Sequence, residues 1–121
     1  MSPDRRALAA LAVAVSVALT GCSSSSSASN TGAGGRTTID ITFKNGTVTP
    51  HGGRVKVRVG KPVTLHIAAD AAGQIHVHST PEQRIDFTAG VSDKRLTINR
   101  PGIVDVEDHV LDTVIVQLQV S

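Results

Sequence analysis

The chain has 121 residues, 40% of them hydrophobic, and its 12 Lys and Arg against 10 Asp and Glu give a formal net charge of +2 at pH 7. This near balance of charge, with Phe43 and Phe87 as the only aromatic side chains, argues against nucleic-acid binding, which depends on basic surfaces and stacking rings. Cys22 is the single cysteine, so an intrachain disulfide is excluded.

The first 21 residues have the order of residues typical of an export signal. Arg5 and Arg6 form a short basic region, and residues 7–19 follow as a run of 13 residues that is apolar apart from one serine. A helix needs about 20 apolar residues to cross a bilayer. We therefore predict a cleaved signal peptide over residues 1–21 and not a buried helix or a permanent span.

The signal ends in Leu19-Thr20-Gly21-Cys22, which resembles the lipobox of bacterial lipoproteins. The resemblance implies that Cys22 becomes the first residue of the mature protein, with a diacylglycerol on its thiol and a fatty-acyl chain, such as palmitate, on its amine. Each buried methylene adds about 0.8 kcal/mol, so two or more chains make a lasting anchor. The expected location is the extracytoplasmic face of the cell membrane, in the cell envelope.

Residues 22–36 are rich in Ser and Gly and predict a flexible linker. Residues 37–121 are predicted to form one domain. With two Phe residues and no Trp or Tyr, its core must consist of Val, Ile and Leu, a composition that favours β-structure.

Alternation of apolar and polar residues marks the strands of this domain. It is strictest in residues 54–59, where Val55, Val57 and Val59 are predicted to be buried, and recurs in residues 63–67 and 114–120. Weaker patterns lie in residues 38–43, 75–78, 85–87, 96–98 and 103–106. Turn signals separate the segments, at Asn45-Gly46, Gly52-Gly53, Gly60-Lys61-Pro62, Ala89-Gly90 and Arg100-Pro101-Gly102. The prediction is an all-β domain, a Greek-key antiparallel β-sandwich of about 7 to 8 strands.

The order of these features resembles a cupredoxin-like domain over residues 39–121. Residues 54–67 match a strand, Gly-x-Pro turn and strand; residues 75–78 match the segment of the first histidine ligand; and residues 100–109 match the Pro-Gly segment before the C-terminal ligand loop. The chain departs from the family because it has no cysteine or methionine after Cys22. A blue-copper site needs a thiolate and usually an axial thioether, so blue-copper electron transfer is excluded.

Two pairs of side chains carry the candidate chemistry. His76 and His78 are two residues apart on a predicted strand and therefore point to one face, and the same holds for Glu107 and His109 if the chain stays extended. The resemblance implies that the two pairs meet at one end of the sandwich. A set of imidazole and carboxylate donors suits Cu(II) best and Zn(II) next. Ca(II) and Mg(II) are not expected there, because imidazole is a poor ligand for these hard cations.

The resulting hypothesis is a membrane-anchored envelope lipoprotein that binds copper or another divalent metal for capture or delivery. The alternatives are a vestigial cluster with internal hydrogen bonds only, or a metal-free interaction module that contacts another envelope protein. His66, on the outward face of a strand, and His51, in a loop, are not expected to be ligands. Nucleophile elbows and Gly-rich phosphate loops are missing from the sequence, so no enzymatic activity is expected.

Charge is uneven along the domain. Residues 36–61 contain six basic residues and one acid, whereas residues 101–121 contain four acids and no Lys or Arg. Arg54, Lys56 and Arg58 would lie on one strand face. That face either contacts anionic lipid headgroups, at about 1 kcal/mol per charge, or is a solvated face that protects an edge strand from aggregation.

Overall fold

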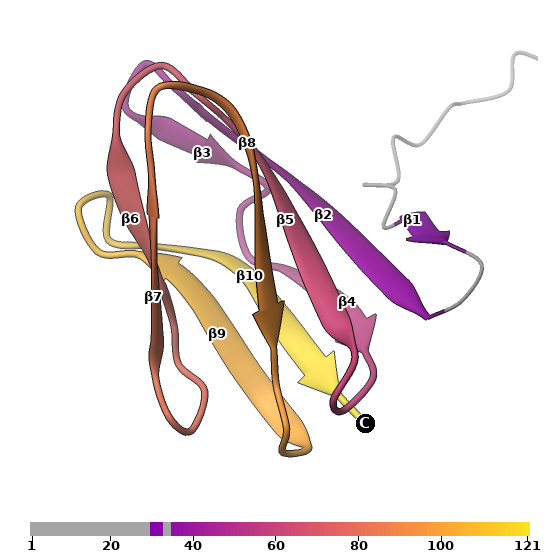
Figure 1. The fold of residues 1–121 in the computed structure, drawn as a ribbon. Helices are drawn as coiled ribbons and strands as arrows, with labels where there is room; N and C mark the ends of the chain where they lie inside the picture. The colour runs from indigo at the N-terminus through magenta and orange to yellow at the C-terminus, as the bar shows by residue number, and fades with distance from the viewer. Residues whose placement is uncertain (1–29, 33–34) are drawn as a thin grey trace, which may run out of the picture.

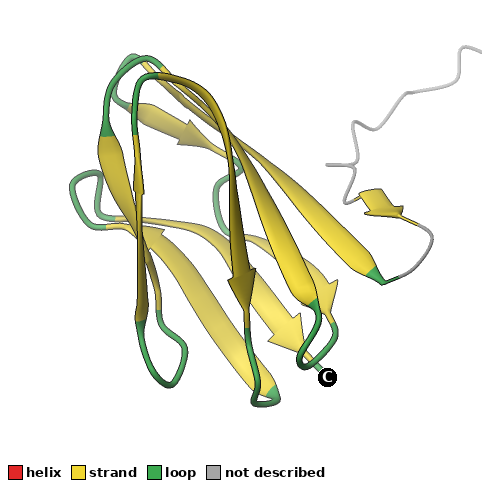
Figure 2. Ribbon diagram, viewed as in Figure 1, coloured by secondary structure: helices red, strands yellow, loops and turns green. Residues whose placement is uncertain are grey.

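Alternating apolar and polar residues form ten β-strands in the computed structural model, which describes residues 30–32 and 35–121 (Figure 1). The strands are β1 (Asn30–Gly32), β2 (Arg36–Lys44), β3 (Thr47–Thr49), β4 (Gly53–Val57), β5 (Pro62–Ala69), β6 (Gly73–Val77), β7 (Gln83–Phe87), β8 (Gly90–Thr97), β9 (Gly102–Asp108) and β10 (Thr113–Val120). The described residues contain strands and loops only (Figure 2). Within them, no helix has the length and hydropathy that crossing a bilayer requires.

The strands form two mixed sheets. One has the order β1-β2-β5-β8, with β3 also paired to β2, and the other has the order β4-β10-β9-β6-β7. The predicted all-β sandwich is confirmed, with the addition that two pairs, β2 with β5 and β4 with β10, are parallel. Both are pairs of strands that are not consecutive in the chain, whereas the consecutive strands that pair with each other, such as β2 with β3 and β6 with β7, are antiparallel.

All eight predicted segments are strands, and β1 and β3 are additional. β3 follows the predicted Asn45-Gly46 turn, where both residues have positive φ, 52° and 71°, as a two-residue hairpin turn requires. β1 lies inside the stretch predicted as a linker and pairs antiparallel with β2. Residues 1–21 and Cys22 lie outside the described residues, so the signal peptide and the lipid anchor remain predictions.

One burial prediction was wrong. Val55 and Val57 are buried, but Val59 is 37% exposed. β4 ends at Val57, and Gly60 then adopts a positive φ of 70°, so the turn carries Val59 away from the interior. Strand alternation buries a side chain only while the strand lasts.

The core lies between the two sheets and consists almost entirely of Val, Ile and Leu, as the composition predicted. Phe43 of β2 and Phe87 of β7 stack across the two sheets with ring centroids 4.6 Å apart. At the other side of the second sheet, β4 is an edge strand, and Arg54 and Lys56 on it are exposed. This position agrees with the second interpretation of the basic residues, in which they form a solvated face that protects an edge strand from aggregation.

Candidate metal centre

The first histidine pair lies on the outer face of β6. Ile75 and Val77 are fully buried, so His76 and His78 both point away from the core, as the alternation predicted. β6 ends at Val77, but the backbone N–H of His78 donates to the carbonyl of Asp105 on β9, at 2.9 Å. This bond extends the pairing by one residue and keeps His78 on the face of His76.

The second pair lies at the end of β9. Val106 is fully buried, and Glu107 therefore points outward. The buried side chain of Asp108 accepts hydrogen bonds from the backbone N–H groups of Val110, at 2.8 Å, and Leu111, at 2.9 Å. This turn ends β9 and places His109 beside the sheet face. Asp108 is therefore a structural residue whose carboxylate is used in the turn.

Strand pairing brings the two pairs together. β6 and β9 are antiparallel neighbours, with His76 opposite Glu107 in the register. One ligand atom each from His78, Glu107 and His109 lies within 4.8 Å of the other two. The two pairs of side chains therefore lie side by side, as the resemblance implied. Three of the four predicted residues form the compact group, and His76 is not one of them.

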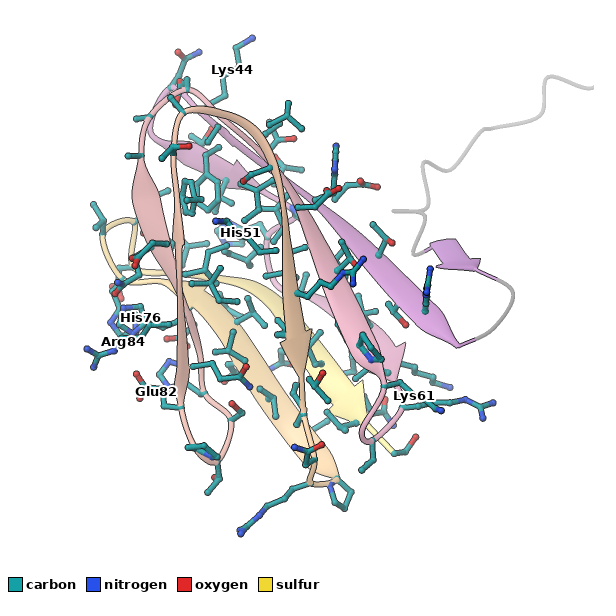
Figure 3. All side chains as sticks on the ribbon, viewed as in Figure 1. Lys44, His51, Lys61, His76, Glu82 and Arg84 are labelled. Atoms are coloured by element: carbon teal, nitrogen blue, oxygen red, sulfur yellow. The ribbon has the colours of Figure 1, made fainter. Side chains whose placement is uncertain are left out.

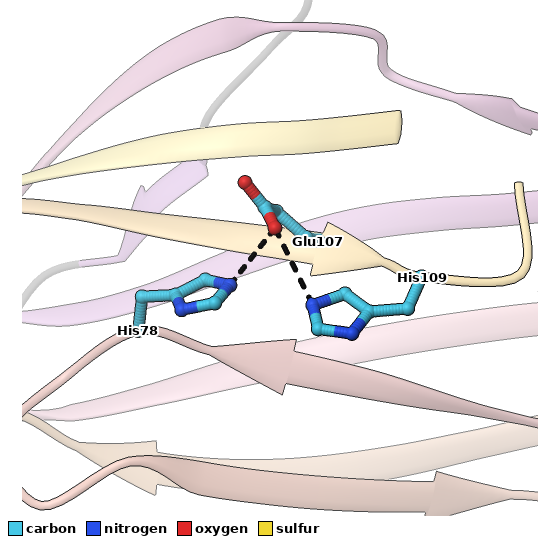
Figure 4. A group of neighbouring side chains, drawn as sticks. All are labelled: His78, Glu107 and His109. Atoms are coloured by element: carbon cyan, nitrogen blue, oxygen red, sulfur yellow. Dashed lines mark hydrogen bonds and ion pairs between the residues drawn. The ribbon is translucent and has the colours of Figure 1, made fainter. Parts of the chain in front are cut away.

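Glu107 connects the two histidines of this group (Figure 4). Its Oε2 atom accepts a hydrogen bond from Nε2 of His78 at 2.8 Å and lies 3.5 Å from Nε2 of His109. The side chains are partly open to solvent, with 39% of His78, 27% of Glu107 and 51% of His109 exposed. An ion can reach all three from outside.

His76 lies beside this group and contributes no atom to it. Its ring stacks on that of His109, with centroids 3.9 Å apart and an angle of 20° between the planes. The His76 side chain is only 13% exposed, and its Nδ1 atom lies 3.4 Å from Oε1 of Glu82 without reaching hydrogen-bond geometry. His76 is thus the innermost of the clustered imidazoles.

Two further residues surround His76, and the sequence analysis did not identify them. Glu82 precedes β7, and Arg84 lies on β7 opposite His76 in the register; Figure 3 shows the three side chains together. Nε of Arg84 is 3.4 Å from Oε1 of Glu82. The hydrogen bond from Arg84 holds the pKa of the Glu82 carboxyl below its ordinary value, with a smaller contribution from His76. The sequence does not specify which strand pairs with β6, so it gave no signal that Glu82 and Arg84 would lie next to His76.

The two distances from the Glu107 carboxylate oxygen to the histidine nitrogens fit a shared metal ion. Zinc–nitrogen bonds of about 2.0 Å imply about 3.3 Å between neighbouring ligand atoms in a tetrahedral site, and about 2.8 Å in a square-planar one. The 2.8 Å and 3.5 Å separations between Glu107 and the two histidines span these values. Two imidazole nitrogens and a carboxylate oxygen suit Cu(II) or Zn(II).

The other two histidines of the domain lie elsewhere, as predicted. His66 is on β5, in the opposite sheet, and its Nδ1 atom is 2.6 Å from Oδ1 of Asp93 on β8. This hydrogen bond raises the pKa of His66 above its ordinary value. His51 is exposed in the loop between β3 and β4. Neither belongs to the compact group.

No protein-family model and no curated protein matches the chain. Solved structures do match. A mutant of amicyanin with Cu(I) is 13% identical, with a TM-score of 0.51 over 69% of this chain and 82% of that one. A copper binding protein in the apo form is also 13% identical, with a TM-score of 0.54 over 72% of this chain and 89% of that one. At this identity the likeness concerns the fold alone, and the domain has a cupredoxin-like fold.

Proposed function

We propose that this protein binds Cu(II) through His78, Glu107 and His109 and serves in copper capture or delivery at the outer face of the cell membrane. The observation that carries the proposal is the position of the Glu107 carboxylate, whose Oε2 atom lies 2.8 Å from Nε2 of His78 and 3.5 Å from Nε2 of His109. His78 and Glu107, 29 positions apart in the chain, converge there with His109 on one point of the surface.

The choice of copper is supported by the donors and by the fold. Among divalent first-row ions, nitrogen and oxygen sites bind Cu(II) most tightly, with Zn(II) weaker. The structures that share this fold include amicyanin with Cu(I) and a protein described as copper binding. The bound ion would supply a Lewis-acidic centre, while the chain's own residues hold it in a partly exposed position.

The exposure of the site favours capture or delivery over electron transfer. The domain has no cysteine or methionine, and these ligands create the blue-copper site. His109 is half exposed and Glu107 about a quarter exposed, so the ligands are open to exchange with donors from outside. A lipid anchor on Cys22 would keep the site at the membrane surface.

The test is a Cu(II) titration of the full chain, purified in mild detergent, by calorimetry with electron paramagnetic resonance (EPR) on the same samples. We expect one tight equivalent with nitrogen hyperfine structure. The variant His78→Ala should weaken binding by more than about 100-fold, because it removes a direct ligand, whereas lost outer contacts cost about 10- to 100-fold.

The matched control is His66→Ala, which removes an exposed imidazole from the opposite sheet and should leave the Cu(II) affinity unchanged. Weak binding of several ions by the wild type, or equal losses in the two variants, would overturn the proposal. The cluster would then be held by hydrogen bonds only, and an interaction with another envelope protein would become the better explanation.

A further inference from the structure

We propose that His76 is a positioning residue that holds the His109 ring from its inner side and does not coordinate the ion. This inference rests on the proposed function and concerns the same site. It leaves two imidazoles and one carboxylate as the ligands from this chain. Because 39% of His78 and 51% of His109 are exposed, a further donor from a partner protein or a small molecule could reach a bound ion from outside.

The stacking geometry carries the argument. A metal ion bound to an imidazole lies in the plane of the ring, along the nitrogen lone pair. The planes of His76 and His109 are 20° from parallel, and the ring centroids are 3.9 Å apart. An ion in the plane of His109 therefore lies well outside the plane of His76, so the two rings cannot bind the same ion while they are stacked.

The surroundings of His76 also hold it in the stack. The ring is 13% exposed, against 51% for His109. Its Nδ1 atom faces Oε1 of Glu82 at 3.4 Å, and Arg84 contacts the same oxygen from the neighbouring position. Moving His76 toward the ion would require it to leave both His109 and Glu82.

His109 needs such support. It follows the last residue of β9, beyond the β6–β9 pairs, so strand pairing does not fix its ring. Its second ring neighbour, His78, is farther away, with centroids 5.6 Å apart. Of these two ring neighbours, His76 is therefore the one that packs directly against the exposed ring of His109. Ligand rings held in position lose less freedom when they bind an ion.

The experiment compares His76→Phe, which retains an aromatic face but has no ligand atom, with His76→Ala, which removes both. Cu(II) is the probe, with affinity from calorimetry and the number of coupled nitrogens from EPR. We expect His76→Phe to stay within about 3-fold of the wild type, and His76→Ala to bind about 10- to 100-fold more weakly, the usual cost of a lost supporting contact. All three proteins should show nitrogen coupling from two imidazoles.

The inference is overturned if His76→Phe loses a coupled nitrogen, or if its affinity falls as far as that of His78→Ala. The wild-type spectrum is an independent check that needs no variant to fold, because coupling from three imidazoles contradicts the inference and coupling from two supports it. Failure of the proposed function looks different: the wild type itself would then bind no tight equivalent of Cu(II).

Discussion

Histidine side chains of this domain differ because of what surrounds each ring. His66 lies on the outer face of the first sheet, between Asp93 on β8 and Asp40 on β2 in the strand register. The hydrogen bond to Asp93 is the main cause of its raised pKa, and the charges of Asp93 and Asp40 add to it. The protonated form of His66 is therefore more favourable in the folded chain than in the unfolded one.

We predict that this pair makes the free energy of unfolding depend on pH. A group whose pKa is raised by folding stabilises the fold fully below its unfolded pKa, near 6.5, and this contribution is lost as pH rises through the folded pKa. The variant Asp93→Asn should therefore be destabilised at about pH 5.5 relative to the wild type, and much less at about pH 8.5. Denaturant unfolding at both pH values measures the difference.

High salt should shrink that difference, because both side chains are exposed. A destabilisation of Asp93→Asn that is equal at the two pH values would contradict the assigned role of His66.

At the scale of the element, β6 depends on a close contact at its first residue. Gly73 is paired with Phe87 of β7, and a Cβ atom at Gly73 would come within 2.5 Å of the Phe87 ring. Phe87 is buried and stacked on Phe43, so the ring has little room to move. The absence of a side chain at Gly73 thus lets β6, which carries His76, lie against the aromatic pair.

The variant Gly73→Ala should lower the free energy of unfolding by about 1–3 kcal/mol, the usual cost of overpacking a core. Gly53→Ala is the matched control, since Gly53 also begins a strand but a Cβ there meets no atom within 4 Å. We expect the control to change stability by less than about 0.5 kcal/mol. Equal stability of the two variants in denaturant unfolding would show that the Phe87 ring adapts without cost.

The domain as a whole depends on one aliphatic core between two sheets. Cys22 is the only cysteine, so no intrachain disulfide supports the fold, and small domains without such links have only a narrow margin of stability. Leu65 on β5 is among the side chains with no exposed surface. It lies on a central strand of the first sheet, between β2 and β8.

We predict that Leu65→Ala removes about 2–5 kcal/mol of stability through lost burial and a residual cavity. Val91→Ala is the control, because Val91 is 68% exposed and its loss should cost less than about 0.5 kcal/mol. The measurement is thermal and denaturant unfolding of both variants. A loss below about 1 kcal/mol for Leu65→Ala would mean that the sandwich collapses to fill the space.

The sequence by itself determined the strands and their faces. Alternation is a local signal, because residues two positions apart on a strand point to the same face of the sheet. It therefore placed His76 with His78 and Glu107 outward on its strand, and the Asn45-Gly46 pair marked a hairpin. It failed at Val59, where the strand ended two residues earlier than the alternation did.

Only the tertiary structure decided which of these side chains meet. The β6–β9 register sets Glu107 opposite His76, and the turn at Asp108 places His109 against the His76 ring. The β6–β7 register sets Arg84 opposite His76, and Glu82 lies near His76 just before β7 begins. The parallel pairs β2–β5 and β4–β10 were likewise decided at this level. These features depend on contacts between segments distant in the chain, and a pattern of period two contains no information about the strand that will become its neighbour.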